Sequence, residues 1–171
     1  THENWELILI NDGSTDSSLD LIEEYSRSNP KIKRFIRGSD LKGASVCRNE
    51  GANMADGDYL IFLDSDDQLS PNCLENRVKR FKENPDKDFL VFYCELFKEK
   101  PGDTKLLWNI RTKVPDLQRY IAHDLSWHTT SPIWKKQSFL NLGGFDEKAT
   151  CMQDWELHLR ALVGNFNYIY F

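Results

Sequence analysis

The chain has 171 residues, which is enough for one domain with a sizeable buried core. Its 22 Lys and Arg against 27 Asp and Glu leave a net charge of −5, which argues against a protein that binds nucleic acid over a broad surface. A composition that is 40% hydrophobic and 12% aromatic excludes a disordered chain, and the apolar runs are far shorter than the roughly 20 residues that span a bilayer.

The first half of the chain predicts strands that alternate with helices. The expected strands cover residues 5–11, 32–37, 59–63 and 89–97. Residues 5–11 and 59–63 are apolar and rich in β-branched or aromatic side chains, which is typical of strands buried on both faces. The helices expected between them have inner faces that include Leu19, Ile22 and Tyr25, then Ala44, Cys47 and Met54, then Leu74, Val78 and Phe81.

The second half is less regular. Residues 98–130 predict loops and short helices, because Pro and Gly interrupt every pattern there. The elements expected after them are a strand at 133–135, a helix at 136–142, a helix at 153–163 and a strand at 167–171. The order of elements predicts an α/β fold, Rossmann-like, with a mostly parallel mixed sheet flanked by helices.

An acidic turn follows the first predicted strand. In an open α/β sheet, ligands bind outside the carboxyl ends of the strands, where Asp12 is expected. Gly13 permits a tight turn, and the Asp12 carboxylate could accept hydrogen bonds from a sugar hydroxyl or a base N–H. An Asp-Gly turn before a Ser or Thr is also ordinary chemistry for starting a helix, so this motif alone is weak.

A second acidic turn, Asp64-Ser65-Asp66-Asp67, follows the strand expected at 59–63. Three carboxylates within four residues repel one another unless they are solvated or bound to a cation. Oxygen ligands of this kind suit Mg²⁺ or Mn²⁺. Leu69 stands where a calcium-binding EF-hand loop requires Gly, which excludes that motif. The alternative is an acidic loop that caps the next helix.

Cations and a third carboxylate lie elsewhere in the sequence. Lys42 and Arg48 are expected close to the two acidic turns, where the base or phosphates of a nucleotide could use them. A solvated helix face is the alternative for both. Asp154 begins a predicted helix, which is ordinary charge complementarity with the helix dipole. Asp154 becomes a candidate general base only in combination with the two acidic turns and the nearby cations.

Taken together, five motifs resemble glycosyltransferase family 2, the inverting enzymes of GT-A fold. They lie at residues 11–16, 43–49, 56–67, 143–147 and 153–157, so the resemblance covers nearly the whole chain. It implies that Asp12 contacts the nucleoside, that Arg48 contacts the base or its surroundings, and that Asp64 reaches the ribose. Ser65 is expected to bind the nucleotide sugar with them. It further implies that Asp66 binds the metal and that Asp154 is the catalytic base.

The resemblance also implies the reaction. A sugar would pass from a nucleotide-diphosphate sugar, with a UDP-sugar favoured, to a hydroxyl of a glycan or lipid-linked acceptor, with Mn²⁺ or Mg²⁺ as cofactor. In an inverting transfer the acceptor hydroxyl attacks opposite the leaving group, so a carboxylate takes the proton on one side while a cation neutralises charge on the other. The expected role is cell-surface polysaccharide synthesis, in the cytoplasm or at the inner face of the membrane.

Three departures from the family pattern stand out. Asn11 stands where the family often has a second Asp, and Gln153 replaces an acidic residue just before the base. Family members usually begin with a further strand and helix of roughly 30 residues before the strand at 5–11. The expectation is therefore a single GT-A domain without that first unit, in which residues 1–97 form the nucleotide and metal half and residues 98–171 form the acceptor half.

Two other functions stay open at this point. Gln153 and the missing first unit are compatible with a binding or structural module that keeps the fold without turnover. Residues 62–69 also resemble the strand and loop of haloacid-dehalogenase-type phosphatases, in which Asp64 would accept a phosphoryl group. That pattern wants Gly and Thr where Asp67 and Gln68 stand. On the acceptor side, Trp127 and His128 are candidates for contact with a sugar ring, with loop packing as the alternative.

Overall fold

A computed structural model of the chain describes residues 2–38, 43–108, 110–124 and 127–171. Lys42, one of the two expected cations, lies outside these residues. The described helices are α1 (Ser18–Ser28), α2 (Ala44–Met54), α3 (Cys73–Glu83), α4 (Asp116–Ile121), α5 (Lys136–Asn141) and α6 (Gln153–Val163). The described strands are β1 (Leu7–Asn11), β2 (Ile32–Ile36), β3 (Tyr59–Leu60), β4 (Phe89–Val91), β5 (Glu95–Leu96), β6 (Leu106–Leu107), β7 (Pro132–Lys135) and β8 (Tyr168–Tyr170).

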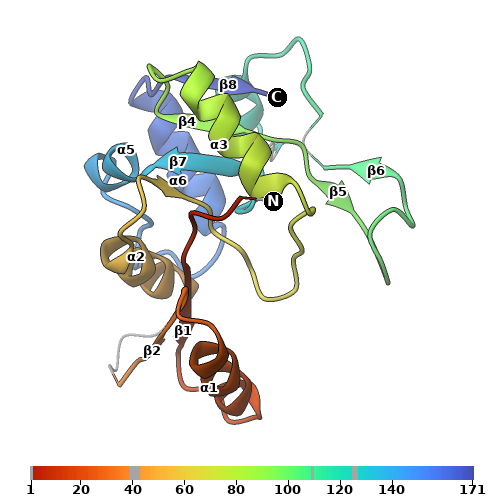
Figure 1. Cartoon of the computed structure of the whole chain (residues 1–171). Coiled ribbons are helices and arrows are strands. Elements are labelled where there is room, and N and C mark those ends of the chain that lie inside the picture. The colour runs from red at the N-terminus through yellow and green to blue at the C-terminus, as the bar shows by residue number, and fades with distance from the viewer. Residues whose placement is uncertain (1, 39–42, 109, 125–126) are drawn as a thin grey trace.

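The described strands form three sheets (Figure 1). β1 pairs with β2 in parallel, β5 pairs with β6 in an antiparallel hairpin, and the central sheet has the order β3-β7-β4-β8. β7 runs antiparallel to both β3 and β4, whereas β4 and β8 are parallel. The α/β fold is confirmed, but its antiparallel share is larger than predicted. The long excursion between β4 and β7 leaves room for the chain to reverse its direction before it re-enters the sheet.

β1 is half-buried, so the prediction of a strand buried on both faces is wrong. Leu7 is 37% exposed, and of the five residues of β1 only Asn11 is buried. Among the described strands its partner is β2, and these two strands and α1 stand apart from the central sheet (Figure 1). A strand with one neighbour leaves part of its surface in solvent. Tyr25 of α1 is also exposed, so its expected place on the inner face of the helix is wrong.

The central sheet carries the core. All three residues of β4 are fully buried, and the ring of Phe89 stacks on Trp134 of β7 at 4.2 Å and on Tyr168 of β8 at 5.1 Å. Ring pairs of this kind contribute roughly 0.5–1.5 kcal/mol each beyond the burial of their area. The aromatic residues predicted for strands 89–97 and 167–171 therefore hold the sheet together.

Two strands are shorter than predicted. β3 ends at Leu60, because its ladder with β7 covers residues 59–60 alone, and Leu63 is exposed. The segment that follows leaves the sheet and carries Asp64 beyond its edge. The strand expected at 89–97 divides into β4 and β5, and β5 lies in the hairpin that projects from the body (Figure 1).

The helices match their predicted ranges more closely than their predicted inner faces. α6 has the predicted bounds, and α5 ends one residue before its expected end. Met54 of α2 is 37% exposed, so its expected place on the inner face is wrong. In α3, Phe81 is buried as expected, and so is Arg77, which was not among the residues expected on the inner face. Helical spacing indicates the direction of a face and does not show which long-range contacts cover it.

His158 of α6 is buried in the aromatic core. It is 1% exposed, its Nδ1 lies 3.2 Å from the hydroxyl of Tyr120, and its ring stacks on Trp134. Burial, with a smaller contribution from His128, lowers the pKa of His158 to about 3. The folded protein therefore keeps this imidazole neutral at pH values where an unfolded chain would protonate it.

We expect the free energy of unfolding to fall as the pH drops below about 6.5, since the unfolded chain then binds a proton that folded His158 does not. Between about pH 7 and about pH 5.5 this difference is worth about 1 kcal/mol. Urea unfolding of the wild type and of His158→Phe at both pH values measures it, with His2→Gln as the control. An equal pH dependence in His158→Phe and the wild type would contradict this account.

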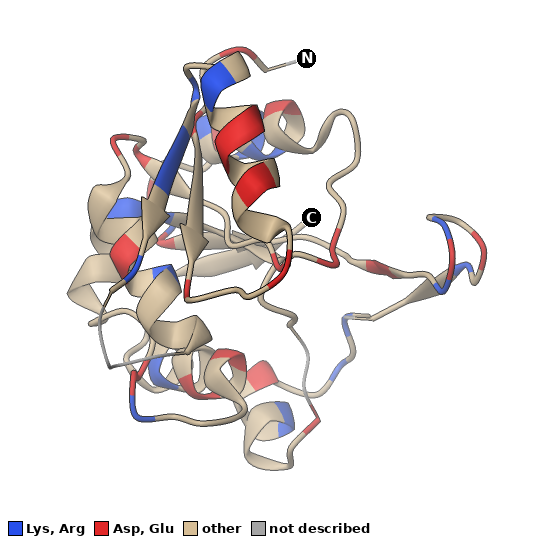
Figure 2. Cartoon of the chain, turned by 90° about the horizontal axis from the view of Figure 1, so that it is seen from below, with Lys and Arg blue, Asp and Glu red and all other residues tan. Residues whose placement is uncertain are grey.

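Charge is dispersed over the fold. Lys and Arg are interspersed with Asp and Glu along most of the helices, whereas the strands carry few charged residues (Figure 2). In the ranges given above, no helix combines the length and the apolar character that crossing a membrane requires.

Candidate active site

The first acidic turn is closed by Asn11. The Asn11 side-chain oxygen accepts hydrogen bonds from the backbone N–H groups of Gly13 at 3.0 Å and Ser14 at 3.1 Å. Gly13 has a φ of 88°, which is the left-handed conformation expected of it. Asn in place of a second Asp therefore keeps the acceptor oxygen that this turn needs.

Among the described residues, Asp12 contacts Arg37 and Gly43, and the sequence did not indicate Arg37. Its Oδ1 accepts a hydrogen bond from Arg37 Nη1 at 2.6 Å, and its Oδ2 accepts one from the N–H of Gly43 at 2.8 Å. Arg37 Nε also lies 2.7 Å from Glu50 of α2. Burial opposes the charge of this guanidinium, but Glu50 and Asp12 outweigh it and raise the pKa of Arg37. The ion pairs thus tie the first acidic turn to α2.

Arg37 was missed although a signal for it exists. It directly follows β2, and its backbone N–H donates to the carbonyl of Asn11 at 3.0 Å. Parallel strands end at the same edge of a sheet, so the residue after one strand lies beside the residue after its neighbour. Applied to residues 11–12 and 37, this rule would have brought Arg37 and Asp12 together.

Arg48 and Asp64 meet as expected. Arg48 Nη2 lies 2.5 Å from Asp64 Oδ1, and the guanidinium packs over the ring of Phe145 at 5.2 Å. Both side chains are partly buried, at 15% and 31% exposure. Since Asp12 contacts the N-terminal end of α2 and Asp64 contacts Arg48 within it, α2 joins the two acidic turns.

The second acidic turn also meets a segment far along the chain. Atoms of Asp64, Asp67 and His128 that can bind a metal lie within 4.8 Å of one another. The Asp67 carboxylate accepts a hydrogen bond from the Thr130 hydroxyl at 2.5 Å. Two carboxylates and an imidazole are a donor set that fits Mn²⁺ and related divalent ions. Ser65 and Asp66 are exposed on the same turn.

Trp127 and His128 differ in their surroundings. Trp127 is 1% exposed, and its indole N–H donates to the hydroxyl of Tyr170, so its expected contact with a sugar ring is wrong. His128 is partly exposed beside Asp67, and its expected contact with a sugar stays a prediction.

Asp154 lies in the first turn of α6, as predicted. Its Oδ1 accepts a hydrogen bond from the N–H of Trp155 at 2.9 Å. Met152, at the N-cap, has a φ of 53°, which is uncommon for a residue other than Gly. The Trp155 indole N–H donates to the carbonyl of Tyr120 at 2.8 Å, and this bond fixes the start of α6 against α4. The convergence of Asp154 with the two acidic turns stays a prediction.

A turn at 143–147 connects α6 to α2. Arg160 of α6 donates to the carbonyl of Gly144 at 2.6 Å. Asn49 of α2 receives the N–H of Phe145 at 2.8 Å and donates to the carbonyl of Phe145 at 2.9 Å and to Glu147 at 3.0 Å. The helix that carries Asp154 and the helix that carries Arg48 are therefore joined through one hydrogen-bonded turn.

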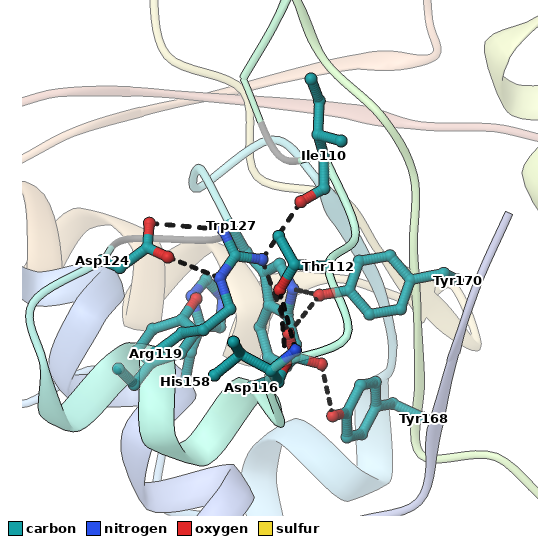
Figure 3. Close-up of polar contacts among 11 residues, drawn as sticks. Ile110, Thr112, Asp116, Arg119, Asp124, Trp127, His158, Tyr168 and Tyr170 are labelled. Carbon is teal, nitrogen blue, oxygen red and sulfur yellow. Dashed lines mark hydrogen bonds and ion pairs between the residues drawn. The ribbon is translucent and has the colours of Figure 1, made fainter.

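Behind α6, a polar network fixes α4 to β8 (Figure 3). The Asp116 carboxylate accepts hydrogen bonds from the hydroxyls of Tyr168 at 2.7 Å and Tyr170 at 2.8 Å. Arg119 donates to Asp124 through Nε at 2.7 Å and Nη2 at 3.3 Å. Burial first, and Asp116 second, raise the pKa of Tyr168, so it stays a neutral donor. The network thus holds α4, the helix that Trp155 contacts, against β8.

Comparison with known proteins identifies relatives of this arrangement. Residues 1–138 match the profile of "Glycosyl transferase family 2". The minor teichoic acid biosynthesis protein GgaB of Bacillus subtilis is 32% identical over 157 residues, which are 91% of this chain and 17% of that protein. Two further curated glycosyltransferases align with 95% of this chain, and the chain spans about half of their length, 53% and 55%.

Solved structures share the fold. S. aureus TarS 1-349 in complex with UDP-GlcNAc superposes with a TM-score of 0.74 at 22% identity, over 97% of this chain and 46% of that one. The mannosyltransferase PcManGT from Pyrobaculum calidifontis, in complex with GDP-Man and Mn²⁺, has a TM-score of 0.66 at 15% identity, over 96% of this chain and 45% of that one. Both similarities support the expected GT-A architecture.

Proposed function

This chain belongs to glycosyl transferase family 2, and we propose that it transfers a sugar, with inversion, from a nucleotide-diphosphate sugar to an acceptor hydroxyl. The observation that carries the proposal is the 2.5 Å pair between Arg48 and Asp64 at the end of the β3 segment, inside the region that matches the family. Carboxylates beside a guanidinium offer both an acceptor for ribose hydroxyls and a cation for phosphates. The alternative of a phosphatase has no support from the family match.

The residues divide into two chemical tasks. Asp12, Arg48, Asp64 and Ser65 would bind the nucleotide, and Asp154 would take the proton of the attacking hydroxyl. A divalent cation, Mn²⁺ or Mg²⁺, would be held at the second acidic turn, with Asp66 as the ligand that the motif implies. When bound, such an ion stabilises negative charge on the leaving diphosphate. Residues 1–97 would then form the nucleotide and metal half, and residues 98–171 the acceptor half, of one GT-A domain.

The donor and acceptor classes rest on the relatives. One structural neighbour is a complex with UDP-GlcNAc and another is a complex with GDP-Man and Mn²⁺, which supports a nucleotide sugar, with UDP favoured, and a divalent metal. The name of GgaB supports a polymer as the product. We therefore propose a glycan or lipid-linked sugar as the acceptor, within cell-surface polysaccharide synthesis in the cytoplasm or at the inner face of the membrane.

Calorimetry on the intact protein tests nucleotide and metal binding together. We expect UDP, GDP or dTDP to bind at least about tenfold more tightly with Mn²⁺ than without it, a difference of about 1.4 kcal/mol. Asp66→Asn should abolish most of that gain, whereas Asp86→Asn, which changes an exposed carboxylate outside the site, should keep it. If none of the three nucleotides shows metal-dependent binding, the proposed function is wrong.

A further inference from the structure

We propose that His128 is a nitrogen ligand of the divalent cation and that it binds this ion together with Asp64 and Asp67. The inference rests on the proposed function, which supplies the reason for a cation in this place. It differs from the motif-based expectation, which names Asp66 alone and draws every ligand from one turn. The predicted ion instead joins the second acidic turn to the segment that leads into β7.

The geometry of the three side chains carries the proposal. Their ligand atoms lie within 4.8 Å of one another, and Asp67 Oδ2 lies 3.5 Å from His128 Nδ1. The N–H of Asp67 donates to the carbonyl of Asp64 at 3.0 Å, and this bond closes the turn that carries both carboxylates. Ligand atoms that one ion holds at about 2.0–2.2 Å lie at most about 4.4 Å apart, so the three side chains need to draw together only slightly to bind it.

The Nδ1 atom of His128 lies on the side of the ring that faces Asp67. The backbone N–H of Thr130 also approaches this nitrogen, at 3.4 Å. A metal ion would bind His128 through the lone pair of this nitrogen. The hydrogen bond is long, and an ion in its place would be the stronger partner. His128 and Asp67 are 38% and 29% exposed, which leaves the cluster open to an ion from solvent.

Neighbouring groups already fix the orientation of these ligands. The Thr130 hydroxyl donates to Asp67 at 2.5 Å, and the backbone N–H of His128 donates to the hydroxyl of Ser131 at 3.0 Å. Metal ligands in proteins are commonly oriented in this way by hydrogen bonds from residues that do not touch the ion. Ser131 is fully buried, so the backbone that carries His128 is anchored in the core.

Arg77 of α3 also anchors the segment that contains His128 and Thr130. It is 5% exposed, its Nη1 donates to the carbonyl of Thr130 at 2.9 Å, and its guanidinium packs over Phe92 at 5.0 Å. Burial lowers the pKa of Arg77. The buried guanidinium therefore fixes the backbone of the segment that carries His128.

A nitrogen ligand changes the expected choice of metal. Imidazole binds Mn²⁺ and later first-row ions better than it binds Mg²⁺, which prefers an all-oxygen shell. We therefore expect the protein to bind Mn²⁺ more tightly than Mg²⁺, and His128→Gln to reduce that preference. The loss of a group that supports or forms a metal site typically lowers metal affinity 10- to 100-fold, so His128→Gln should weaken Mn²⁺ binding at least about tenfold.

Pulsed electron paramagnetic resonance of Mn²⁺ bound to the intact protein tests the assignment directly. We expect electron spin-echo modulation from ¹⁴N in the wild type, and a change to the ¹⁵N pattern when the protein is labelled with ¹⁵N-histidine. The labelled protein needs no substitution, so this result does not depend on the folding of a variant. His128→Gln should lose the signal, and His2→Gln, the control, should keep it.

The outcomes separate this inference from the proposed function. Mn²⁺ that binds and promotes UDP binding without any histidine nitrogen signal would overturn the role of His128 and leave the function standing. A His128→Gln variant with unchanged Mn²⁺ affinity would overturn it as well. The absence of Mn²⁺ binding to the wild type would instead overturn the metal-dependent function, and the assignment of His128 with it.

Discussion

Asp154→Asn is expected to lower kcat by about 10³-fold while nucleotide binding is retained, because a positioned general base contributes roughly 10²–10⁴-fold to proton transfer. Asn is nearly the same size as Asp and keeps an oxygen for the Trp155 N–H, which now lies 2.9 Å from Asp154 Oδ1. The start of α6 should therefore stay in place. What changes is the ability of this side chain to take a proton from the acceptor hydroxyl.

Release of UDP from a UDP-sugar measures turnover in this experiment, and calorimetry measures UDP affinity. An unchanged KM for the donor with a reduced kcat would indicate that the loss lies in the chemical step. Asp20→Asn is the matched control, since Asp20 also lies in the first turn of a helix, α1, and should leave both values unchanged. A variant that keeps a kcat close to that of the wild type would show that Asp154 is not the base. A wild-type protein that binds UDP without turnover would favour the non-catalytic module.

Gly144→Ala is expected to lower the free energy of unfolding by about 3 kcal/mol. Gly144 has a φ of +69°, where a side chain costs about 1–2 kcal/mol, and an added Cβ would lie 2.5 Å from Asn49 Oδ1. Asn49 cannot move away without breaking hydrogen bonds, because its amide makes three of them to Phe145 and Glu147. Each bond that breaks costs about 1 kcal/mol.

Gly143→Ala is the matched control for this prediction. Gly143 lies in the same turn with a φ of +91°, but its added Cβ would meet only Arg160 Nη1 at 3.9 Å, so it should cost about 1 kcal/mol for the backbone alone. Urea unfolding measures both variants. In an Asn49→Ala background the contact is gone, and Gly144→Ala should then cost only as much as Gly143→Ala. Additive effects of Asn49→Ala and Gly144→Ala would contradict the predicted contact.

The parts of the site that could be predicted are those whose signal is local. Asp154 at the start of α6, the turn made by Asn11 and Gly13, and the nearness of Arg48 to Asp64 follow from strand ends, helix starts and family motifs. These features depend on residues close together in the chain or on elements in a familiar order. The family, the fold and the transferase class were predicted for the same reason.

The parts that could not be predicted depend on contacts between distant segments. The helical pattern gives no sign that Arg77 is buried, because its partner is the carbonyl of Thr130, 53 residues later. Trp127 reads as an aromatic loop residue until the hydroxyl of Tyr170 covers its indole N–H. The approach of His128 to Asp67 is of the same kind. Each requires the register of the central sheet, which no local pattern contains.

The left-handed backbone at Met152 has a consequence for the helix that it precedes. A residue other than Gly in this conformation stores conformational energy of about 1–3 kcal/mol, and it persists only where surrounding contacts enforce it. The helix that follows Met152 is held in place by the bonds of Trp155 to Tyr120 and of Arg160 to Gly144. Asp154 lies two residues after Met152, so a change that removes either contact is expected to relax the backbone at Met152 and to shift the proposed base.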